Sequence, residues 1–295
     1  MTFTKSKFQG TGVAIVTPFR KDESIDFKAL TGLVNYQIDN KIDYIAVLGT
    51  TGEPVVMSND EKKAVLETVI EAVNGRVPVV VGIGGSSTND VVSKIKAFDL
   101  KNVDAVLSVV PYYNKPSQKG IFEHYKAIAA SSDLPVIAYN VPGRTVVNMT
   151  AETTLKLANE VKNIMAVKEA SGNMLQIMEI IKNKPKDFLV ISGDDGLTYP
   201  LMTLGGDGVI SVVANVCPAE FSEMVRLCLE NKFREALQIQ YKLIDLINLL
   251  FAEGSPAGIK AALEIKGLIS NYLRLPLTPV SDNLFNAIKL QLNKK

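Results

Sequence analysis

The sequence has little of what metal sites and disulfide frameworks require. It contains two cysteines, Cys217 and Cys228, and a single histidine, His124. Two cysteines are too few for a disulfide framework or a zinc site, and their apolar neighbours favour a packing role. One histidine excludes histidine-rich metal sites and any catalytic triad whose base lies elsewhere. We interpret the segment around His124, FEHY, as a helix surface.

An excess of one charge and a long apolar run are missing too. The chain has 32 basic and 31 acidic residues, a net charge of +1, and no block of five or six like charges. Nothing therefore indicates a nucleic-acid partner or an anionic membrane. The longest apolar stretch, 243–251, is interrupted by Asp245 and Asn248, and the N-terminus lacks the apolar region of a signal peptide. We expect no membrane association and a cytoplasmic protein.

What the sequence does contain is a repeated alternation of apolar runs and helical patterns. With 47% hydrophobic residues, the chain can bury a large core. The apolar runs expected to form strands are Val13–Val16, Tyr44–Leu48, Val77–Gly82, Ala105–Val110, Pro135–Tyr139, Ile164–Lys168, Phe188–Ser192 and Gly208–Val212. Helical spacing fills the intervals, and Ser58, Ser87 and Thr150 are N-cap candidates.

This alternation predicts an α/β fold, a (β/α)8 TIM barrel. Eight buried strands alternating with helices fit a closed barrel better than an open doubly wound sheet, which usually has fewer strands. From Pro218 onward helical patterns replace the strand pattern. We predict a catalytic barrel over residues 1–224 and a C-terminal helical region over residues 225–295.

One lysine closes a predicted strand. Lys168 ends the run that starts at Ile164, and alternation places Ala166 and Lys168 on the inward face, with Met165, Val167 and Glu169 on the other. A lysine between apolar walls loses hydration of its ammonium form, so its pKa falls and the free amine becomes a nucleophile. The alternative is a lysine at a strand end that keeps its charge in water.

Polar residues follow other predicted strands at the edge where barrel enzymes place their active sites. The segment GTTGE at residues 49–53 offers backbone N–H groups and the hydroxyls of Thr50 and Thr51, which suit a carboxylate or a phosphate. Tyr113 and Arg144 lie in two later loops, and a guanidinium can hold a carboxylate through two hydrogen bonds. Each feature alone has a simpler structural explanation, but together they indicate a binding site.

The acidic pair after the seventh run has two interpretations. Asp194 and Asp195 could hold Mg²⁺ through their carboxylates, although an acidic helix start explains them as well. The glycine-rich segment 82–87 does not have the spacing of a dinucleotide fingerprint.

The motifs GTTGE, PYYNKPSQ, YNVPGRT, VKEASGN, SGDD and GVISVVAN occur in this order. Together they closely resemble the 4-hydroxy-tetrahydrodipicolinate synthases, also called dihydrodipicolinate synthases, over essentially the whole chain. Other pyruvate-dependent class I aldolases and lyases, including N-acetylneuraminate lyase, share the GxTGE loop, the tyrosine and the lysine. Arg144 and the double tyrosine of PYYN favour the synthases.

The resemblance implies a lyase of lysine and diaminopimelate biosynthesis in which Lys168 forms a Schiff base with pyruvate. It implies that Tyr139 shuttles protons and is linked through Thr50 to Tyr113, which reaches in from a neighbouring subunit. Thr51 resembles the residue that binds the pyruvate carboxylate.

The resemblance also concerns the second substrate and the assembly. Arg144 resembles the residue that receives the carboxylate of L-aspartate 4-semialdehyde, and Gly193, Asp194 and Ile210 lie in the matching motifs as further substrate-binding positions. The resemblance implies no metal or organic cofactor, and a homotetramer built as a dimer of dimers.

Many relatives are inhibited by lysine at a dimer interface that presents Ser-Ala after GTTGE and histidines on the next helix. Here Pro54, Val55, Asn59 and Lys62 occupy those positions, although Tyr112 and Asp90 fit such a site. Because a cation beside a cationic ligand weakens binding, we expect weak or absent lysine inhibition.

Three other functions are compatible with parts of the pattern. A pyruvate-imine aldolase for sugar acids would share Lys168, Tyr139 and Thr51 but want hydroxyl partners in place of Arg144. A noncatalytic barrel that binds a small carboxylate has no need of the imine-forming residues. A metal-dependent aldolase would use Asp194 and Asp195, and the single histidine disfavours it.

Overall fold

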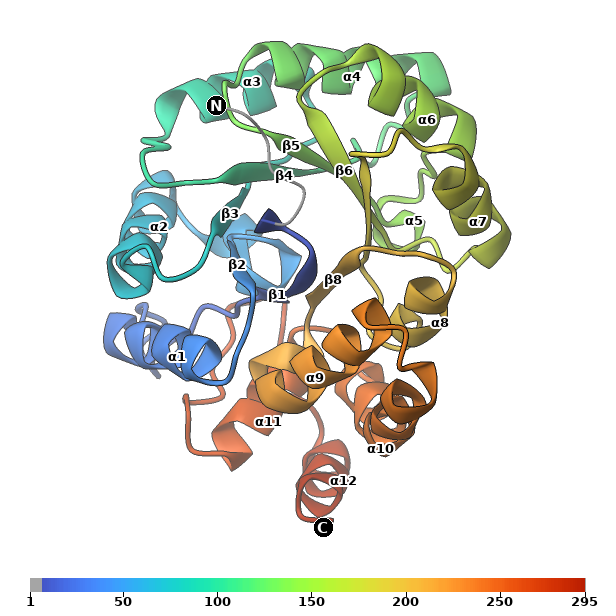
Figure 1. The fold of residues 1–295 in the computed structure, drawn as a ribbon. Helices are drawn as coiled ribbons and strands as arrows, with labels where there is room; N and C mark the ends of the chain where they lie inside the picture. The colour runs from blue at the N-terminus through green and yellow to red at the C-terminus, as the bar shows by residue number, and fades with distance from the viewer. Residues whose placement is uncertain (1–6, 295) are drawn as a thin grey trace.

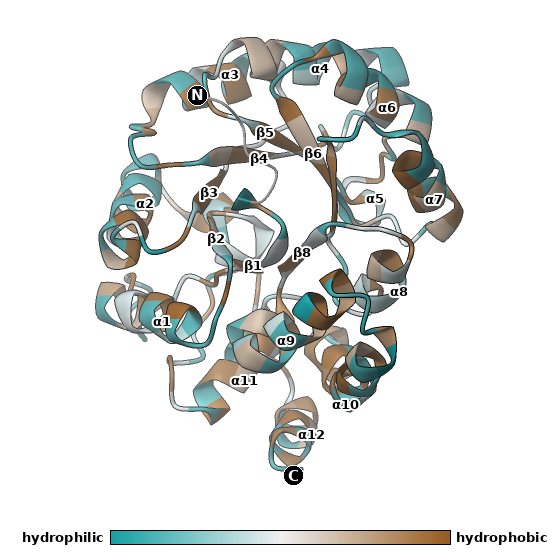
Figure 2. Cartoon of the chain, in the orientation of Figure 1, coloured by the Kyte–Doolittle hydropathy of each residue, from teal (hydrophilic) through white to brown (hydrophobic). Residues whose placement is uncertain are grey.

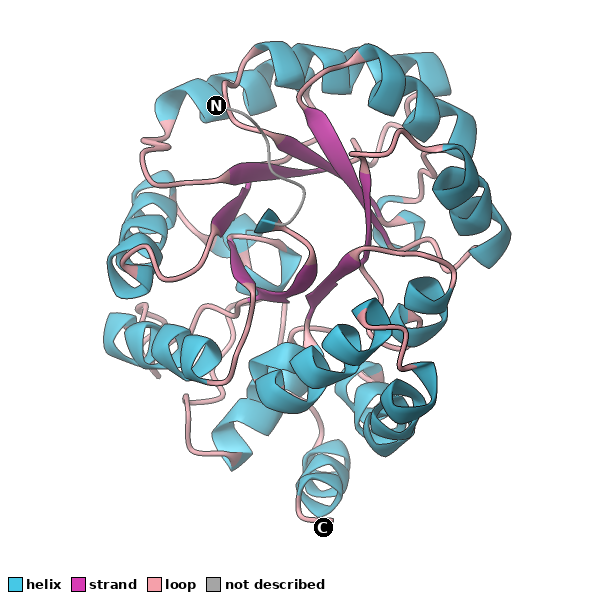
Figure 3. Ribbon diagram, viewed as in Figure 1, coloured by secondary structure: helices cyan, strands magenta, loops and turns pink. Residues whose placement is uncertain are grey.

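The computed structural model describes residues 7–294 and contains a closed barrel of eight parallel strands (Figures 1 and 3). Each strand pairs with the next in the sequence, and β8 closes the barrel by pairing with β1. The strands are β1 (Gly10–Ala14), β2 (Tyr44–Val47), β3 (Val79–Gly82), β4 (Ala105–Val109), β5 (Val136–Asn140), β6 (Ile164–Glu169), β7 (Leu189–Ser192) and β8 (Gly208–Ser211). The barrel predicted from the sequence is confirmed.

Helices surround the strands on the outside of the barrel (Figure 1). They are α1 (Phe27–Asp39), α2 (Asn59–Val73), α3 (Thr88–Ala97), α4 (Gln118–Ala130), α5 (Pro142–Thr145), α6 (Ala151–Glu160), α7 (Met174–Asn183), α8 (Thr198–Thr203) and α9 (Pro218–Leu229). Short 3₁₀ turns are η2 (Thr50–Gly52), η3 (Pro54–Val56) and η4 (Val213–Asn215). The predicted N-caps Ser58, Ser87 and Thr150 each accept a backbone N–H at their helix starts.

Three further helices, α10 (Phe233–Phe251), α11 (Ala257–Ile265) and α12 (Asp282–Leu292), form the predicted C-terminal helical region beside α9 (Figure 1). The predicted division at residue 224 falls inside α9, so this helix spans it. Within residues 7–294, no helix combines the length and apolar character needed to cross a membrane.

Two apolar clusters account for the core, and strands such as β4, β6 and β8 are largely brown, that is hydrophobic, in Figure 2. The larger cluster lies between the strands and the helices around them. The smaller one fills the barrel interior and includes Tyr44, Ala166, Tyr139 and Ile210. Side chains thus fill the interior of the barrel, and the candidate site lies at the carboxyl ends of the strands, where barrel enzymes place their active sites.

Local details differ from the sequence predictions. Strand β1 begins at Gly10 rather than at Val13, because glycines take strand positions here: a Cβ on Gly12 would lie 2.2 Å from Cε2 of Tyr44. Met165 was predicted to face away from the interior but packs inside it. The register between β5 and β6 shifts next to Met165, and this irregularity breaks the simple alternation.

The prediction of a surface position for His124 was wrong. Its side chain is buried on α4, and its Nδ1 lies 2.9 Å from Oγ1 of Thr88 on α3. Burial lowers the pKa of His124 to about 4, which keeps the ring neutral near pH 7. The ring therefore has a packing role between two helices.

Candidate active site

The site is built around Lys168, which lies near the carboxyl end of β6. Lys168 pairs in register with Tyr139 on β5, and its ammonium nitrogen lies 4.4 Å from the centroid of the Tyr139 ring. Only 6% of Lys168 is exposed, so the prediction that it points inward, on the side of Ala166, is confirmed. The apolar run that forms β6 thus delivers a buried amine to the top of the barrel.

The surroundings of Lys168 weaken its hold on a proton. Burial is the main cause that lowers the pKa of Lys168 to about 8, and the positive charge of Arg144 acts in the same direction. The charge of Asp195 opposes both. Burial also raises the pKa of Tyr139 to about 12, so this phenol is protonated near pH 7. The pair therefore combines an amine that loses its proton more readily than a free lysine with a phenol that can donate a proton.

Gly193 allows β7 to end against the lysine stem. A Cβ at this position would lie 3.0 Å from Cε of Lys168 and 2.9 Å from Cβ of Ala170. These distances are shorter than ordinary carbon contacts, so only glycine leaves the lysine in place. Gly193, which the resemblance gave as a substrate-binding position, thus lies against the stem of Lys168.

Asp195, which the sequence suggested as a metal ligand or as part of an acidic helix start, lies close to Lys168 in the structure. It is 3% exposed and accepts hydrogen bonds from Oγ of Ser211 at 2.5 Å and from the N–H of Val212 at 3.0 Å. Burial raises the pKa of Asp195 to about 6, but these bonds favour the charged form. The carboxylate supplies a negative charge near Lys168. The position of Asp195 just after the seventh predicted strand was the feature of the sequence that could have indicated this location.

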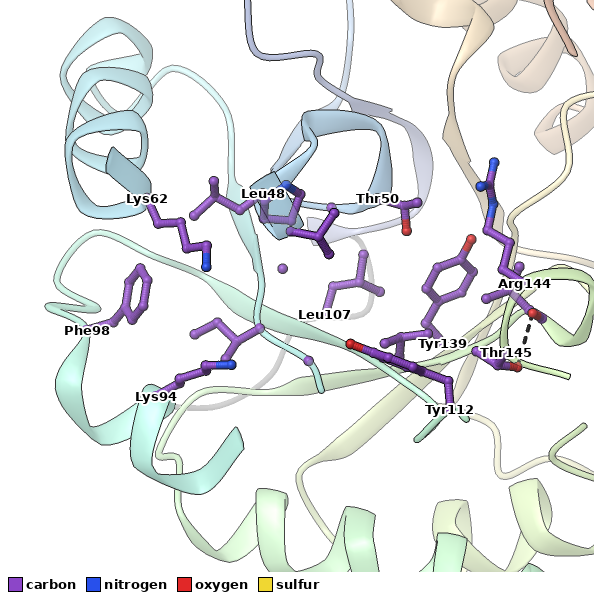
Figure 4. Close-up of a pocket in the computed structure, with 18 of the residues that line it drawn as sticks. Leu48, Thr50, Lys62, Lys94, Phe98, Leu107, Tyr112, Tyr139, Arg144 and Thr145 are labelled. Carbon is purple, nitrogen blue, oxygen red and sulfur yellow. Dashed lines mark hydrogen bonds between the residues drawn. The ribbon is translucent and has the colours of Figure 1, made fainter. Parts of the chain in front are cut away.

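A cavity of about 600 Å³ opens above these strands (Figure 4). Thr50, Tyr139 and Arg144 line it, which brings together three residues predicted from separate loops. The side chains of Thr50 and Tyr139 both extend into the cavity in Figure 4. Lys168 lies beside this cavity, against the Tyr139 ring.

The loop after β2 holds Thr50 and Thr51 through its own backbone. Turn η2 is closed by a hydrogen bond from the N–H of Gly52 to the carbonyl of Gly49 at 2.9 Å. Oγ1 of Thr17 donates to the carbonyl of Gly52 at 2.8 Å, which ties the loop to the end of β1. Thr51 is 5% exposed, whereas Thr50 is exposed toward the cavity.

The loop after β5 places Arg144 at the rim. Arg144 lies in the short helix α5, and Thr145 next to it donates from Oγ1 to the carbonyl of Val147 at 2.8 Å. Val146 adopts a positive φ of 58°, a conformation that costs a β-branched residue energy and that these contacts maintain. The guanidinium is exposed and free to meet an anion entering the cavity.

Buried hydrogen bonds on the outer side of the barrel hold the ends of β5 and β6, which carry Tyr139 and Lys168. Nδ2 of Asn140 on β5 lies 3.1 Å from Oε2 of Glu169 on β6, and Gln176 of α7 donates to the same oxygen at 3.2 Å. The phenol of Tyr125 on α4 accepts the N–H of Tyr139 at 3.3 Å. Because the ends of β5 and β6 are bonded to each other and to two helices, Tyr139 and Lys168 keep their relative positions.

Three predicted residues, Tyr113, Asp194 and Ile210, do not line this cavity within one chain. Tyr113 is 86% exposed, has a positive φ of 76° and does not line the cavity. Asp194 accepts N–H bonds from Gly196 and Leu197 in its own turn. Ile210 lies in the barrel interior below the cavity, with 1% of its surface exposed. Among residues 7–294, no group of three or more histidine, cysteine or acidic side chains has an arrangement suited to a metal ion.

The outer part of the cavity is lined by Pro54, Val55, Asn59 and Lys62, together with Lys94. Lys94 forms an ion pair of 2.6 Å with Asp90, and the ammonium groups of Lys62 and Lys94 both point into the cavity in Figure 4. The charge of Lys94 contributes to lowering the pKa of Lys62, after burial. Two ammonium groups thus lie in the part of the cavity that corresponds to the lysine site of the relatives. Weak or absent inhibition by lysine stays a prediction.

Comparison with known proteins agrees with the motifs. The sequence model of the Dihydrodipicolinate synthetase family matches residues 7–295 of this chain. The 4-hydroxy-tetrahydrodipicolinate synthase of Phocaeicola vulgatus is 54% identical over 98% of both chains. The enzyme of the same name from Parabacteroides distasonis is 56% identical over 92% of this chain and 91% of its own.

A solved structure gives the same result for the fold. The chloride-inhibited dihydrodipicolinate synthase of Acinetobacter baumannii, complexed with pyruvate, superposes with a TM-score of 0.94 at 40% identity. The match covers 96% of this chain and 97% of the other.

Proposed function

The chain belongs to the dihydrodipicolinate synthetase family and is a lyase of the 4-hydroxy-tetrahydrodipicolinate synthase type, and we propose that it condenses pyruvate with L-aspartate 4-semialdehyde through a Schiff base on Lys168. The observation that carries the role of Lys168 is its burial at the end of β6 against Tyr139, with a pKa lowered to about 8. A related structure with pyruvate bound supports the choice of the first substrate.

Pyruvate binds with its keto carbon near the amine of Lys168. Its carboxylate meets the backbone N–H groups and hydroxyl of Thr51, in a loop whose short turn orients such donors. The neutral amine adds to the keto carbon, and the resulting carbinolamine loses water to form an iminium ion. Both steps move protons, and the phenol of Tyr139 gives and takes them, with Thr50 as its neighbour across the cavity.

The iminium ion then makes the pyruvate methyl group acidic. Loss of a methyl proton gives an enamine, and its carbon attacks the aldehyde of L-aspartate 4-semialdehyde. The carboxylate of this substrate binds Arg144 at the cavity rim. The amine of the same substrate finally attacks the iminium carbon, closes the ring and releases Lys168. Asp195 offsets the positive charge of the iminium stage.

We extend the proposal to the assembly and to the remaining residues. Tyr113 completes the proton relay of a neighbouring subunit in a homotetramer, and its 86% exposure in a single chain is compatible with that role. Gly193, Asp194 and Ile210 shape the floor and wall of the pyruvate site. The cytoplasmic location expected from the sequence stays a prediction.

Turnover with different aldehydes tests the proposal. Purified protein should consume pyruvate together with L-aspartate 4-semialdehyde and should be inactive with pyruvate and a sugar aldehyde. Arg144→Met should raise the KM for L-aspartate 4-semialdehyde about 10-fold or more, because one bidentate ion pair is lost, and should change the KM for pyruvate much less. Preferential turnover of the sugar aldehyde would contradict the proposal and support a sugar-acid aldolase.

A further inference from the structure

An ion pair between two fully buried side chains joins the C-terminal helical region to the GTTGE loop. Lys260 on α11 is 0% exposed and Glu53, which ends the loop motif, is 2% exposed. The ammonium of Lys260 contacts Oε1 of Glu53 and donates to the carbonyl of Tyr272 at 3.0 Å. It also lies 4.1 Å from the centroid of the Phe19 ring.

Burying an ion pair of this kind contributes little to folding stability, because both charges lose their hydration. Burial raises the pKa of Glu53 and lowers the pKa of Lys260 to about 8, so both side chains lose hydration that their contact only partly replaces. Apolar side chains of similar volume would often give equal or greater stability. The pair therefore calls for an explanation other than folding stability.

The location of Glu53 suggests that the ion pair serves to position the neighbouring loop. Glu53 is the C-cap of the turn that contains Thr50, Thr51 and Gly52, and it takes a left-handed conformation, with φ 59° and ψ 38°. Its own N–H donates to the carbonyl of Thr50 at 3.1 Å, which closes the turn that carries both threonines. A residue other than glycine holds this conformation only where its surroundings maintain it. Here the Glu53 carboxylate is anchored by Lys260.

A second anchor holds the other end of the same segment. Arg274, which also comes from the C-terminal region, donates to the carbonyl of Val56 at 3.0 Å and to both carboxylate oxygens of Glu61, at 2.5 and 2.9 Å. Glu61 is part of the capping box that starts α2. The chain from Glu53 to the start of α2 is therefore held at both ends by residues outside the barrel.

We propose that Lys260 and Glu53 are positioning residues, through which the C-terminal helical region holds the Thr50–Thr51 turn in the geometry that receives the substrate carboxylate. The inference rests on the proposed function, in which that turn binds pyruvate. Neither residue contacts the substrate. The C-terminal region thus contributes to catalysis within a single chain.

Kinetics of two variants test the inference. Lys260→Met and Glu53→Gln each remove one charge and keep the approximate size of the side chain. Each should raise the KM for pyruvate about fivefold or more, because displacement of a binding turn by a fraction of an ångström weakens its hydrogen bonds. The KM for L-aspartate 4-semialdehyde, which binds at Arg144, should change less than twofold. Borohydride with pyruvate should still modify Lys168.

A matched control uses the ion pair between Lys184 and Asp207. These side chains are also largely buried, with a nitrogen to oxygen distance of 3.0 Å, but they lie between the starts of β7 and β8, on the opposite face of the barrel. Lys184→Met should reduce the free energy of unfolding without raising the KM for pyruvate. An equal rise in KM in this variant would overturn the inference.

The double variant Glu53→Gln/Lys260→Met separates positioning from folding. It leaves no unpaired buried charge, so it should be more stable than either single variant and serves if these fail to fold. Positioning predicts that its KM for pyruvate stays raised. A KM equal to that of the unmodified protein would overturn the inference, while absence of a pyruvate adduct in the unmodified protein would instead contradict the proposed function.

Discussion

At the scale of single residues, the chemistry depends on how readily Lys168 loses its proton. Its burial lowers the pKa to about 8, while the negative charge of Asp195 acts in the opposite direction and, in the proposed mechanism, offsets the charge of the iminium ion. The sequence allowed this prediction, because an apolar run that ends in lysine places the amine between buried walls. It could not show that Asp195 turns inward, since its neighbour Asp194 carries the same charge and serves a turn.

The first prediction at this scale concerns pH. Because the folded pKa lies below the value of 10.5 for a free lysine, the neutral fraction of Lys168 rises as the pH increases through about 8. The rate of imine formation with pyruvate should follow this rise and level off above it. Stopped-flow measurement of the rate from pH 6 to 10 checks the profile.

Arg144→Met serves as the control for this profile. The charge of Arg144 lowers the pKa of Lys168, so its removal should move the midpoint to higher pH. A profile that is independent of pH between 7 and 9 would contradict the assignment of Lys168 as the reacting amine.

A second prediction concerns Gly193. Gly193→Ala places a Cβ 3.0 Å from Cε of Lys168, so the amine must shift and imine formation should slow about 10-fold or more. Gly196→Ala is the matched control in the same loop, because its nearest atom would be 3.4 Å away. Comparison of kcat/KM for the two variants checks the prediction, and equal activities would show that Lys168 has room to move.

At the scale of secondary structure, the apolar runs predicted all eight strands because buried parallel strands consist mostly of aliphatic residues. The errors arose where tertiary packing overrides local pattern. Gly12 in β1 makes room for Tyr44, and the irregularity beside Met165 turns an extra side chain into the interior. His124 was misplaced because the segment FEHY suggested a helix surface, whereas Thr88 of α3 packs against the ring.

Tyr125 gives a test at this scale. Its phenol donates to the carbonyl of Ser108 on β4 at 2.8 Å and accepts the N–H of Tyr139 on β5, so α4 holds two adjacent strands. Tyr125→Phe leaves these buried groups with fewer partners, which should reduce the free energy of unfolding by about 1–3 kcal/mol. Urea denaturation measures the change.

Tyr36→Phe provides the comparison. Its hydroxyl makes a single bond of 3.3 Å to the carbonyl of Val216, in a partly buried position. The loss of stability should therefore be smaller than for Tyr125→Phe. A larger loss at Tyr36 would show that the Tyr125 hydroxyl does not hold the strands together.

At the scale of the whole molecule, the sequence did not predict which side chains far apart in the chain contact each other. Glu53 and Lys260 lie in different halves of the chain, and their pairing follows only from how the C-terminal helices fold back onto the barrel. The predicted role of Tyr113 likewise depends on a contact that one chain cannot show, namely a contact with a neighbouring subunit. It is 86% exposed, so its predicted role in the proton relay requires a second subunit.

This dependence leads to a prediction about assembly. Tyr113→Phe should reduce kcat about 10-fold or more, because it removes the end of a proton relay, whereas Tyr241→Phe, at a position that is 64% exposed, should have no effect. Dilution of the unmodified protein until sedimentation velocity shows monomers should reduce its specific activity to a similar extent. Full activity of the monomer would remove Tyr113 from the relay.

The central claim is that Lys168 forms an imine with pyruvate, and chemical trapping tests it most directly. The protein is incubated with pyruvate and sodium borohydride, its intact mass is measured, and the modified residue is located by peptide mapping. The account predicts one reduced pyruvate adduct per chain, on Lys168, and none in Lys168→Ala. An unmodified chain, or an adduct on another lysine with Lys168 untouched, would contradict it.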